Sequence, residues 1–431
     1  MKYDLIVVGA GATGLVAANL AHERGRRVLV LERADRPGGR LRTDRDDAYV
    51  FDHGFQVLLT AYPAVRKWLD LDALGTRAFL PGAHVLLPDG SRTTVGDPLR
   101  EPGRLVDTLR SPVGTLADKA RLLRLVAYVR SRDSEALFRT PETSTLRFLL
   151  EYGFSATVID RFFRPFYGGI FLERELATSS RCFLFTFKMF AEGSAALPRT
   201  GIQAVAEQLA GRLPPATIRY GAEVTSLHGD GVALAGGERL EAHRVIDATS
   251  PPGPLPHPTD RWLTTVTLYV AAPRTSLPPR HITLVPGGGP VNNVAVVSGV
   301  QPSWSPPDRH LLSLSLYVPA GKTTLAYAQT AAEALAPWLG DELDDWRALR
   351  HYDIAHALPF AAHAEWSAPV SRWRGADGVV STGDWRLHPS LQAAMLAGEC
   401  AAGAVPQARA RVTGVAAGGR PANRAPRDGG P

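Results

Sequence analysis

The chain has 431 residues, 45% of them hydrophobic, and a formal net charge of +6. This length suits two domains, and no uninterrupted apolar run approaches the roughly 18 residues that a membrane-spanning helix needs. Residues 407–431 hold five arginines and one aspartate, and the rest of the chain has no basic stripe interleaved with aromatic residues, so nucleic acid is not an expected partner.

The N-terminus and the cysteines bear on location. The first expected strand begins at Tyr3, which leaves no room for a signal peptide ahead of it. Two cysteines, Cys182 and Cys400, cannot build a disulfide framework, and neither has a Cys or His at metal-site spacing. We therefore predict a cytoplasmic protein without a metal site, in which both cysteines are small buried residues or one of them is a reactive thiol.

The first elements predict the start of a parallel sheet. Residues 3–8 form an apolar run that Gly9 ends, residues 15–24 have the pattern of a helix, and Gly25 is well placed just past its end. Residues 27–32 form a second apolar run. A strand, a helix and a second strand in this order are typical of an α/β fold with a parallel sheet.

The turn between the first strand and the helix carries a phosphate-binding pattern, because Gly9, Gly11 and Gly14 are in a GxGxxG frame. In that motif the glycines permit the tight turn, the approach of a diphosphate and the close packing of helix on strand, while the helix N-terminus faces the phosphates. Glu32 ends the second strand, where it can accept hydrogen bonds from a ribose diol, and it disfavours a 2′-phosphate beside Arg33. The pattern predicts a dinucleotide, either NAD or FAD.

The rest of the chain changes from helical to strand-like periodicity and back. The expected elements are, in chain order, helices within 98–190 with a capping box from Thr115 to Asp118 and a helix over 146–152, strands within 216–249 and 262–318, a helix over 325–339, a strand at 378–382 and a helix over 391–404. Residues 407–431 have almost no apolar periodicity, and we predict a disordered tail.

A second motif follows the second strand. Residues 36–43 have the pattern RxGGRxxT, in which Gly38 and Gly39 precede Arg40. This segment resembles the signature of the flavin amine oxidase, protoporphyrinogen oxidase and phytoene desaturase superfamily. By this resemblance the two glycines run past the diphosphate of FAD and the arginine contacts it, which suits glycine amides and the fork geometry of a guanidinium. The resemblance favours FAD over NAD.

Further segments resemble the same superfamily in the same order along the chain. Residues 381–398 resemble the segment that binds the rest of FAD, with Gly383 and Asp384 at the ribityl and diphosphate region. By the same resemblance, the helix that begins near Leu391 and Gln392 directs its amides at the flavin. Shorter matches are residues 51–56 with Gly54 and Phe55 beside the flavin ring, residues 196–210 leading to a strand whose Val224 contacts the adenosine, and residues 244–249 near the adenine. Noncovalent FAD is the implied cofactor.

These motifs predict an α/β protein in two parts. The first is a Rossmann-type FAD-binding domain with a parallel sheet, assembled from residues 1–97, 191–255 and 350–406. The second is an α+β substrate domain with a mixed sheet and a helical cap, made of residues 98–190 and 256–349.

Several positions depart from the pattern of the superfamily. Monoamine oxidases have a tyrosine of their amine-binding aromatic cage where this chain has Ser390, and no cysteine occupies the position used there for covalent flavin attachment. The GGGP segment at 287–290 opens no expected helix, so a built-in NAD(P)H site is not predicted. Oxygen, a quinone or another soluble acceptor is therefore expected to reoxidise the flavin.

The segment 160–190 is rich in aromatic residues. It contains eight of the 15 phenylalanines, namely Phe162, Phe163, Phe166, Phe171, Phe183, Phe185, Phe187 and Phe190. They could line an apolar tunnel for a lipophilic substrate, or pack the core of the helical domain; a peripheral membrane contact is a further alternative. The alternation of the phenylalanines at 183, 185 and 187 predicts one face of a strand.

The chemistry needs a C–H bond held over the flavin, and not necessarily a protein base. The candidates near the ring are Phe55, Gln56, Trp385, His388 and His356. His388 could be a proton shuttle or a structural histidine. No catalytic acid or base is assigned.

The leading hypothesis is an FAD-dependent dehydrogenase or oxidase that removes two hydrogens from a C–C or C–N bond of an apolar or cyclic small molecule. Its nearest resemblance is to phytoene-desaturase-like and protoporphyrinogen-oxidase-like proteins. The alternatives are a non-redox flavin isomerase or cyclase, an amine or amino-acid oxidase, and a lipid-binding escort on the same fold without active flavin, like the Rab dissociation inhibitors.

Overall fold

A parallel sheet is formed by strands from three distant segments of the chain. The computed structural model describes residues 2–46, 48–97, 100–250 and 261–403. Five parallel strands pair in the order β10-β2-β1-β14-β20. Their bounds are β1 (Leu5–Val8), β2 (Val28–Leu31), β10 (Ile218–Arg219), β14 (Val245–Asp247) and β20 (Val380–Ser381). The predicted fold class, a Rossmann-type α/β sheet assembled from discontinuous segments, is confirmed.

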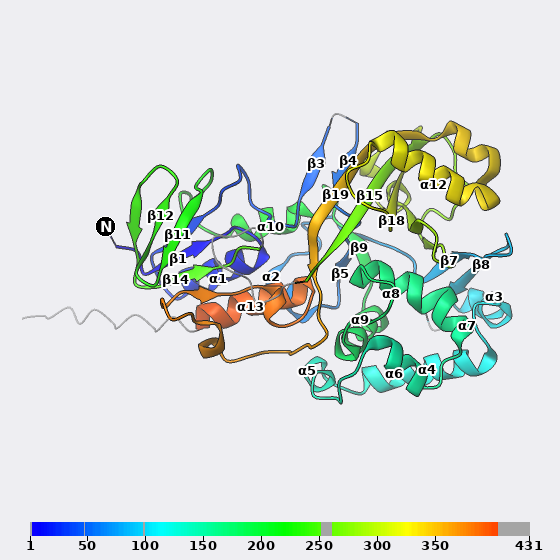
Figure 1. Ribbon diagram of the computed structural model, residues 1–431, viewed down its shortest axis with the longest axis horizontal. Helices are drawn as coiled ribbons and strands as arrows, with labels where there is room; N and C mark the ends of the chain where they lie inside the picture. The colour runs from blue at the N-terminus through cyan, green and yellow to red at the C-terminus, as the bar shows by residue number, and fades with distance from the viewer. Residues whose placement is uncertain (1, 47, 98–99, 251–260, 404–431) are drawn as a thin grey trace, which may run out of the picture.

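Helices from both ends of the chain cover one face of this sheet. α1 (Ala12–Glu23) lies beside α13 (Leu391–Gly403) and packs against α10 (Gln203–Ala210) (Figure 1). α1 begins at Ala12 rather than at Leu15, because Gly11 is its N-cap in extended conformation. On the other face, apolar side chains of β1 and β2 pack against a three-stranded antiparallel sheet of β11 (Val224–His228), β12 (Gly231–Leu234) and β13 (Arg239–Glu241).

The second large sheet has seven strands in the order β19-β15-β18-β17-β16-β7-β8, and its β16–β7 pair is parallel while the other pairs are antiparallel. Their bounds are β7 (Gly82–Leu86), β8 (Arg92–Gly96), β15 (Trp262–Ala272), β16 (Ile282–Leu284), β17 (Val291–Val296), β18 (His310–Leu316) and β19 (Arg347–Pro359). The apolar side of α12 (Thr324–Leu339) packs on one face of this sheet (Figure 1). The mixed sheet expected from the sequence is therefore present.

The strand pairing does not follow the domain boundaries that the sequence suggested. β7 and β8 fall inside the segment 1–97, and most of β19 lies beyond residue 350, yet all three belong to the mixed sheet. β19 escaped prediction because it is a charged edge strand whose side chains before Pro359 are half-buried or exposed, so it lacks the apolar alternation of a strand with one buried face. The division into two domains stays a prediction, and the pairing favours boundaries near Gly82 and Pro359.

A layer of helices lies against the other face of the mixed sheet. It consists of α3 (Leu105–Arg110), α4 (Leu116–Arg130), α5 (Ser134–Leu137), α6 (Thr145–Glu151), α7 (Ala156–Val158), the π-helical turn η2 (Ile159–Phe163), α8 (Arg164–Phe171) and α9 (Ser180–Glu192). The capping box at the start of α4 is confirmed, since Thr115 and Asp118 bond each other's backbone amides.

The strand predicted from the alternating phenylalanines at 183, 185 and 187 is wrong, because these residues lie in α9. α9 is buried around most of its circumference, so apolar side chains fall on an alternating pattern as well as on a helical one. Cys182 in the same helix is buried, as expected, while Cys400 is half-buried. Burial raises the pKa of both thiols, which does not favour a reactive thiolate.

Smaller elements complete the chain. They are the hairpin β3 (Thr43–Arg45) and β4 (Val50–Asp52), the sheet of β5 (Leu58–Leu59), β9 (Ala195–Leu197) and β6 (Arg77–Ala78), the helices α2 (Pro63–Trp68) and α11 (Val297–Val300), and the turns η1 (Pro102–Arg104), η3 (Pro302–Trp304), η4 (Gly340–Asp345), η5 (Val370–Trp373) and η6 (Asp384–Arg386). Within the described ranges no helix has the length and apolar character to cross a bilayer. The predicted tail 407–431 lies outside the described residues.

The contact between α1 and α13 depends on a glycine. A Cβ atom on Gly398 would lie 2.3 Å from the backbone oxygen of Thr13, whereas a Cβ on Gly403 in the same helix would meet nothing within 4 Å. We expect Gly398→Ala to lower the free energy of unfolding by ~1–3 kcal/mol through overpacking. Gly403→Ala should change it by less than ~1 kcal/mol. Urea unfolding of both variants tests this, and equal effects would contradict it.

Candidate functional site

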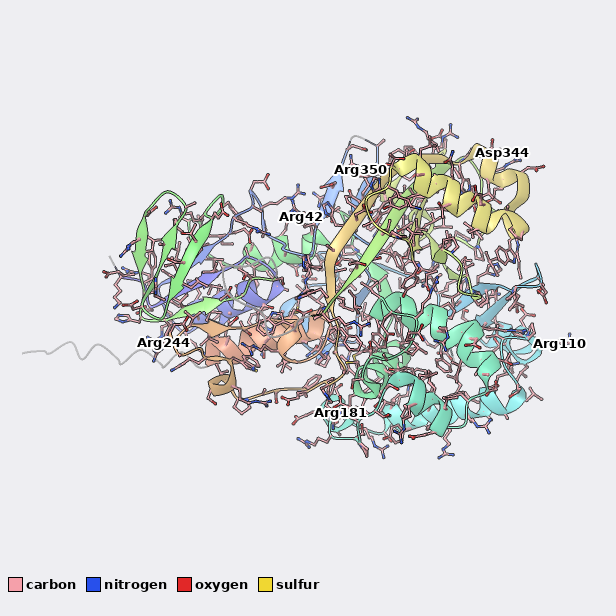
Figure 2. All side chains as sticks on the ribbon, in the orientation of Figure 1. Arg42, Arg110, Arg181, Arg244, Asp344 and Arg350 are labelled. Atoms are coloured by element: carbon pink, nitrogen blue, oxygen red, sulfur yellow. The ribbon has the colours of Figure 1, made fainter. Side chains whose placement is uncertain are left out.

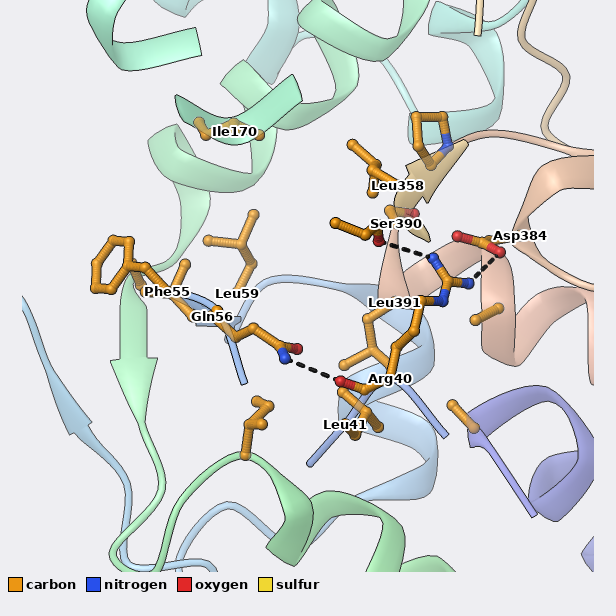
Figure 3. A pocket seen from close by; sticks show the side chains of 18 of the residues that line it. Arg40, Leu41, Phe55, Gln56, Leu59, Ile170, Leu358, Asp384, Ser390 and Leu391 are labelled. Atoms are coloured by element: carbon orange, nitrogen blue, oxygen red, sulfur yellow. Dashed lines mark hydrogen bonds and ion pairs between the residues drawn. The ribbon is translucent and has the colours of Figure 1, made fainter. Parts of the chain in front are cut away.

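One long cavity connects the parallel sheet with the helical layer. Its volume is about 1120 Å³, and its lining extends from the glycine turn after β1 to α4, α8 and α9. Figure 3 shows the middle of this cavity, where Arg40 and Asp384 lie on one side, Phe55 and Ile170 on another, and Gln56 extends from beside Phe55 toward Arg40. The lining combines segments from both ends of the sequence.

The glycine turn forms the end of the cavity beneath the parallel sheet. Gly9 has a φ of 100°, in the left-handed region, and Gly11 pairs with Gly38 through an isolated parallel bridge. A Cβ on Gly11 would meet its nearest atom at 3.8 Å, while one on Gly14 would lie 1.9 Å from the oxygen of Gly9. Gly9 and Gly11 line the cavity, whereas Gly14 does not and instead allows the close packing of α1 on β1.

Glu32 is fixed at the end of β2 by two backbone amides. Ala10 N–H donates to Oε2 at 2.7 Å and Ala34 N–H donates to Oε1 at 2.9 Å. The carboxylate is buried and still lines the cavity, so its remaining lone pairs face that space. Arg33 and Val224 line the same end.

An ion pair joins the two motifs that lie furthest apart in sequence. Arg40 Nη2 is 2.5 Å from Asp384 Oδ1, and Arg40 Nη1 donates to the Ala357 carbonyl (Figure 3). The Asp384 side chain is 3% exposed, so its charge needs this partner. Gly38, Gly39, Arg40 and Asp384 all line the cavity, while Gly383 does not.

The middle of the cavity is bounded by the segment after β4 and by the start of α13. Gly54, Phe55 and Leu391, which the sequence predicts to lie beside the flavin, line it. Gln56 Nε2 donates to the carbonyls of Arg40 and His53, which holds this segment against the second motif. Gln392 does not line the cavity, because its side chain is turned to α2 and accepts from Ala64 N–H at 2.8 Å.

Three of the five candidates for positions near the ring do not reach the cavity. Phe55 and Gln56 line it, whereas Trp385, His356 and His388 do not. His388 is packed against the rings of Phe138, Phe185 and Trp366. Burial lowers the pKa of His388 to about 3, so the ring stays neutral near pH 7. A structural histidine fits this environment, and a proton shuttle does not.

The other end of the cavity is apolar on the side of the helices. Leu122, Leu123 and Val126 of α4 line it, together with Tyr167 and Ile170 of α8. Among the phenylalanines of 160–190, Phe162, Phe166, Phe187 and Phe190 line the cavity, while Phe163, Phe171, Phe183 and Phe185 are buried in the core. Half of these phenylalanines therefore pack the core, and that the other half receive a lipophilic substrate stays a prediction.

The facing wall, from the mixed sheet, carries polar groups that the sequence did not reveal. Thr265 of β15, Asn293 of β17 and Ser315 of β18 line the cavity, and Asn293 pairs with Ser315 in register. Asn292 Nδ2 donates to the Oδ1 of Asn293 at 3.0 Å. A polar residue within an apolar strand has no sequence signal of its own until the direction of each side chain is known.

A polar network beside the cavity was also not predicted. Asp44 accepts hydrogen bonds from Tyr352 and Arg36 and pairs with His53, which lines the cavity. Burial acts to raise the pKa of Asp44, but hydrogen bonds from His53 and Tyr352 outweigh it and bring the value to about 2. Burial lowers the pKa of His53, and Asp44 offsets part of that shift. The network holds His53 beside Gly54 through β19, the strand that sequence analysis missed.

Comparisons with known proteins identify the family. A profile described as flavin containing amine oxidoreductase matches residues 12–406. The chain belongs to this family. Its members are flavoenzymes, and the protein is an oxidoreductase whose cofactor is FAD.

Individual relatives match less of the sequence. Protoporphyrinogen oxidase 2 of Arabidopsis thaliana is 29% identical over 165 residues, which cover 38% of this chain and 31% of that protein. An oxidoreductase from Methanosarcina mazei has a TM-score of 0.68 at 16% identity and covers 93% of this chain and 99% of its own. Cyclohexylamine oxidase from Brevibacterium oxydans IH-35A has a TM-score of 0.67 at 17% identity, with 94% and 99% covered. These two likenesses establish the fold.

The residues of this flavin amine oxidoreductase fit the cofactor of the family. The backbone at Gly11 is open to the cavity, Glu32 offers a buried acceptor at the end of β2, and Arg40 supplies a cation beside the glycine pair. Neither cysteine lines the cavity, which agrees with noncovalent binding.

Asp52, next to His53, is the basis of a prediction on pH. It is 1% exposed, and its Oδ1 accepts from the Thr43 hydroxyl at 2.6 Å and from Ile202 N–H at 2.9 Å. Burial raises the pKa of Asp52 to about 7. Between the pKa of the unfolded chain and this value the folded protein binds the extra proton, so the group loses its stabilising contribution as the pH rises.

We therefore expect Asp52→Asn to abolish the fall in the free energy of unfolding that Asp52 causes as the pH rises. Relative to the variant, the wild-type free energy of unfolding should fall by up to ~1.4 kcal/mol per pH unit between about pH 4 and pH 7. Urea unfolding at a series of pH values in excess FAD measures the difference. Parallel pH profiles of the two proteins would contradict the assignment.

Proposed function

We propose that this flavoenzyme removes two hydrogens from a C–C or C–N bond of a lipophilic or cyclic small molecule, in the manner of phytoene-desaturase-like and protoporphyrinogen-oxidase-like enzymes. The electrons then pass to oxygen, a quinone or another acceptor. A cytoplasmic location and a peripheral membrane contact are parts of this proposal. One observation carries it: the cavity that starts at the glycine turn ends between apolar helices, where Asp97 and Arg100 are the charged lining residues in the described chain.

The end of the cavity at the glycine turn is proposed to hold the cofactor through the residues that the sequence predicts. The amides at Gly11 and Gly39 would face the diphosphate, with Gly9 and Gly38 shaping the turns and Arg40 adding its charge. Glu32 would accept hydrogen bonds from a ribose, with Arg33 and Val224 beside the adenosine. Gly14, Gly383 and Gln392, which do not line the cavity, would act by holding α1, η6 and α13 in place.

The middle of the cavity would hold the flavin ring between the segment at Gly54 and Phe55 and the start of α13 at Leu391. Asp384, paired with Arg40, would accept a hydrogen bond from a hydroxyl of the ribityl chain. When bound, FAD would supply the acceptor for the hydride of a substrate C–H bond, and the proton that accompanies this hydride would pass to water. The apolar side chains of α8 and α9 would orient the substrate and exclude water, while Thr265, Asn293 and Ser315 would receive its polar atoms.

The glycine turn offers a test of cofactor binding that separates it from folding. We expect Gly11→Ala to fold normally, because a Cβ there meets no atom closer than 3.8 Å, but to weaken FAD binding at least tenfold, since the methyl group occupies the space of the diphosphate. Gly14→Ala should instead disrupt folding, because its Cβ would lie 1.9 Å from a backbone oxygen. Circular dichroism and FAD titration measure both effects. A Gly11→Ala protein that keeps wild-type FAD affinity would contradict the placement.

Amine oxidation is a second candidate function, and Asp97 at the apolar end favours it as a counter-ion for an ammonium group. The name of the structurally similar cyclohexylamine oxidase also refers to an amine. Against it, Ser390 replaces the aromatic cage residue and Arg100 lies at the same end. In an amine oxidase Asp97→Asn would raise KM for amines at least tenfold, while an apolar substrate would be little affected.

The test of the proposal is an anaerobic screen of the FAD-loaded protein against lipophilic polyenes, porphyrinogens and amines. We expect apolar compounds to bleach the visible absorbance of oxidised flavin, and added oxygen or quinone to restore it. Bleaching by amines alone would assign the second function. Conversion of a compound without bleaching and without an acceptor would point to a non-redox isomerase or cyclase and overturn the proposal.

A further inference from the structure

The surface of the helical layer has a concentration of exposed apolar side chains. Among the described residues, eight large hydrophobic side chains are exposed, and five of them lie on α3 and α4. We call these five the α3–α4 patch: Leu105, Val106 and Leu109 of α3, and Leu116 and Leu123 of α4. Isolated exposed leucines are ordinary, but a cluster on two neighbouring helices marks an interaction surface.

The patch follows the geometry of its helices. Leu116, Ala120, Leu123 and Ala127 are all exposed and recur at helical spacing, so they form one stripe along the solvent side of α4. The core side of α4 holds Leu125 and Val129 instead. Lys119 ties the two helices together, because its Nζ donates to the carbonyl of Leu109 at 2.7 Å. Figure 1 shows α3 and α4 at the same end of the molecule.

The patch is continuous with the cavity. Leu123 is 51% exposed and also lines the cavity, next to Leu122 and Val126. Arg100 and residues 95–97, which precede α3, line the same end. The apolar end of the cavity therefore meets the surface at the patch, on the opposite side of the molecule from the glycine turn (Figure 1).

The segment that carries the patch is mainly positive in charge. Residues 100–132 contain eight basic and three acidic side chains. Asp118 is buried in the capping box and Glu101 pairs with Arg104, which leaves Asp107 as the exposed acid of this segment. Arg110, at the end of α3, extends outward at the edge of the molecule (Figure 2). Apolar side chains framed by arginines suit the interface of a bilayer with anionic lipids.

We propose that the α3–α4 patch docks on an anionic bilayer and that apolar substrate enters the cavity from the bilayer beside Leu123. The inference rests on the proposed function in that it assumes an apolar substrate. It also relocates the membrane contact considered for the phenylalanine-rich segment 160–190, since none of those phenylalanines is exposed. Docking of a protein partner or a second copy of the chain would not require the positive charges beside the patch. An anionic bilayer accounts for both the apolar side chains and the positive charges.

The test measures binding of the FAD-loaded full chain to vesicles of phosphatidylcholine with and without phosphatidylglycerol. Leu116→Asp is compared with Leu325→Asp, a matched control on α12, because the two leucines are 67% and 65% exposed. We expect Leu116→Asp to weaken binding to anionic vesicles about tenfold or more, and Leu325→Asp to leave it unchanged. Arg110→Glu should weaken binding to anionic vesicles and have no effect on neutral ones.

Three results would overturn the docking surface. Equal binding by both aspartate variants would place any vesicle contact elsewhere, including the arginine-rich residues 407–431, which all variants retain. Absence of binding by the wild type would exclude a bilayer. A wild-type dimer that Leu116→Asp alone dissociates, measured by light scattering, would assign the patch to a second copy. Vesicle binding does not require turnover, so its failure is distinct from a failure of the flavin-bleaching screen.

Discussion

The site depends on the close packing of α1 against α13. Both helices present small side chains to each other, and Gly398 lets the backbone of α13 approach the carbonyl of Thr13. This contact brings the segment before α13 to the glycine turn, where Asp384 meets Arg40. The cavity thus exists only when both ends of the chain have folded together. FAD, which fits the combined site but neither half alone, is expected to stabilise that assembly by mass action.

At the apolar end of the cavity, the two walls differ in polarity because one is a sheet and the other is made of helices. In the mixed sheet, side chains alternate between faces, so the face opposite α12 can carry Thr265, Asn293 and Ser315 while the other keeps its leucines and valines in the core. The helices α4, α8 and α9 present apolar stripes to the same space. A ligand with an apolar body and a few polar atoms, as proposed for the substrate, would match both walls.

The sequence predicts most of what the parallel sheet contributes, because GxGxxG and RxGGRxxT constrain the backbone locally and each glycine has a geometric reason. It predicts less of the mixed sheet, since β19 is polar and the direction of Asn293 depends on strand register. It also misplaces side chains near the ring: His388 is close to the flavin segment in sequence, but its ring turns into an aromatic cluster. The neighbours of a side chain are determined by tertiary packing, which the local sequence does not specify.

The same limit applies to the proposed docking surface, which the sequence pattern did not place on α3 and α4. Phenylalanines at 160–190 give the strongest apolar signal, and for that reason they are buried in the core or the cavity. In α4, by contrast, a core stripe and a solvent stripe are both apolar, and nothing in their spacing distinguishes them. Burying the solvent stripe would require a further layer, and the described chain supplies none there. Leu123 is both exposed and part of the cavity wall, so a covering bilayer would shield the stripe and the cavity entrance together.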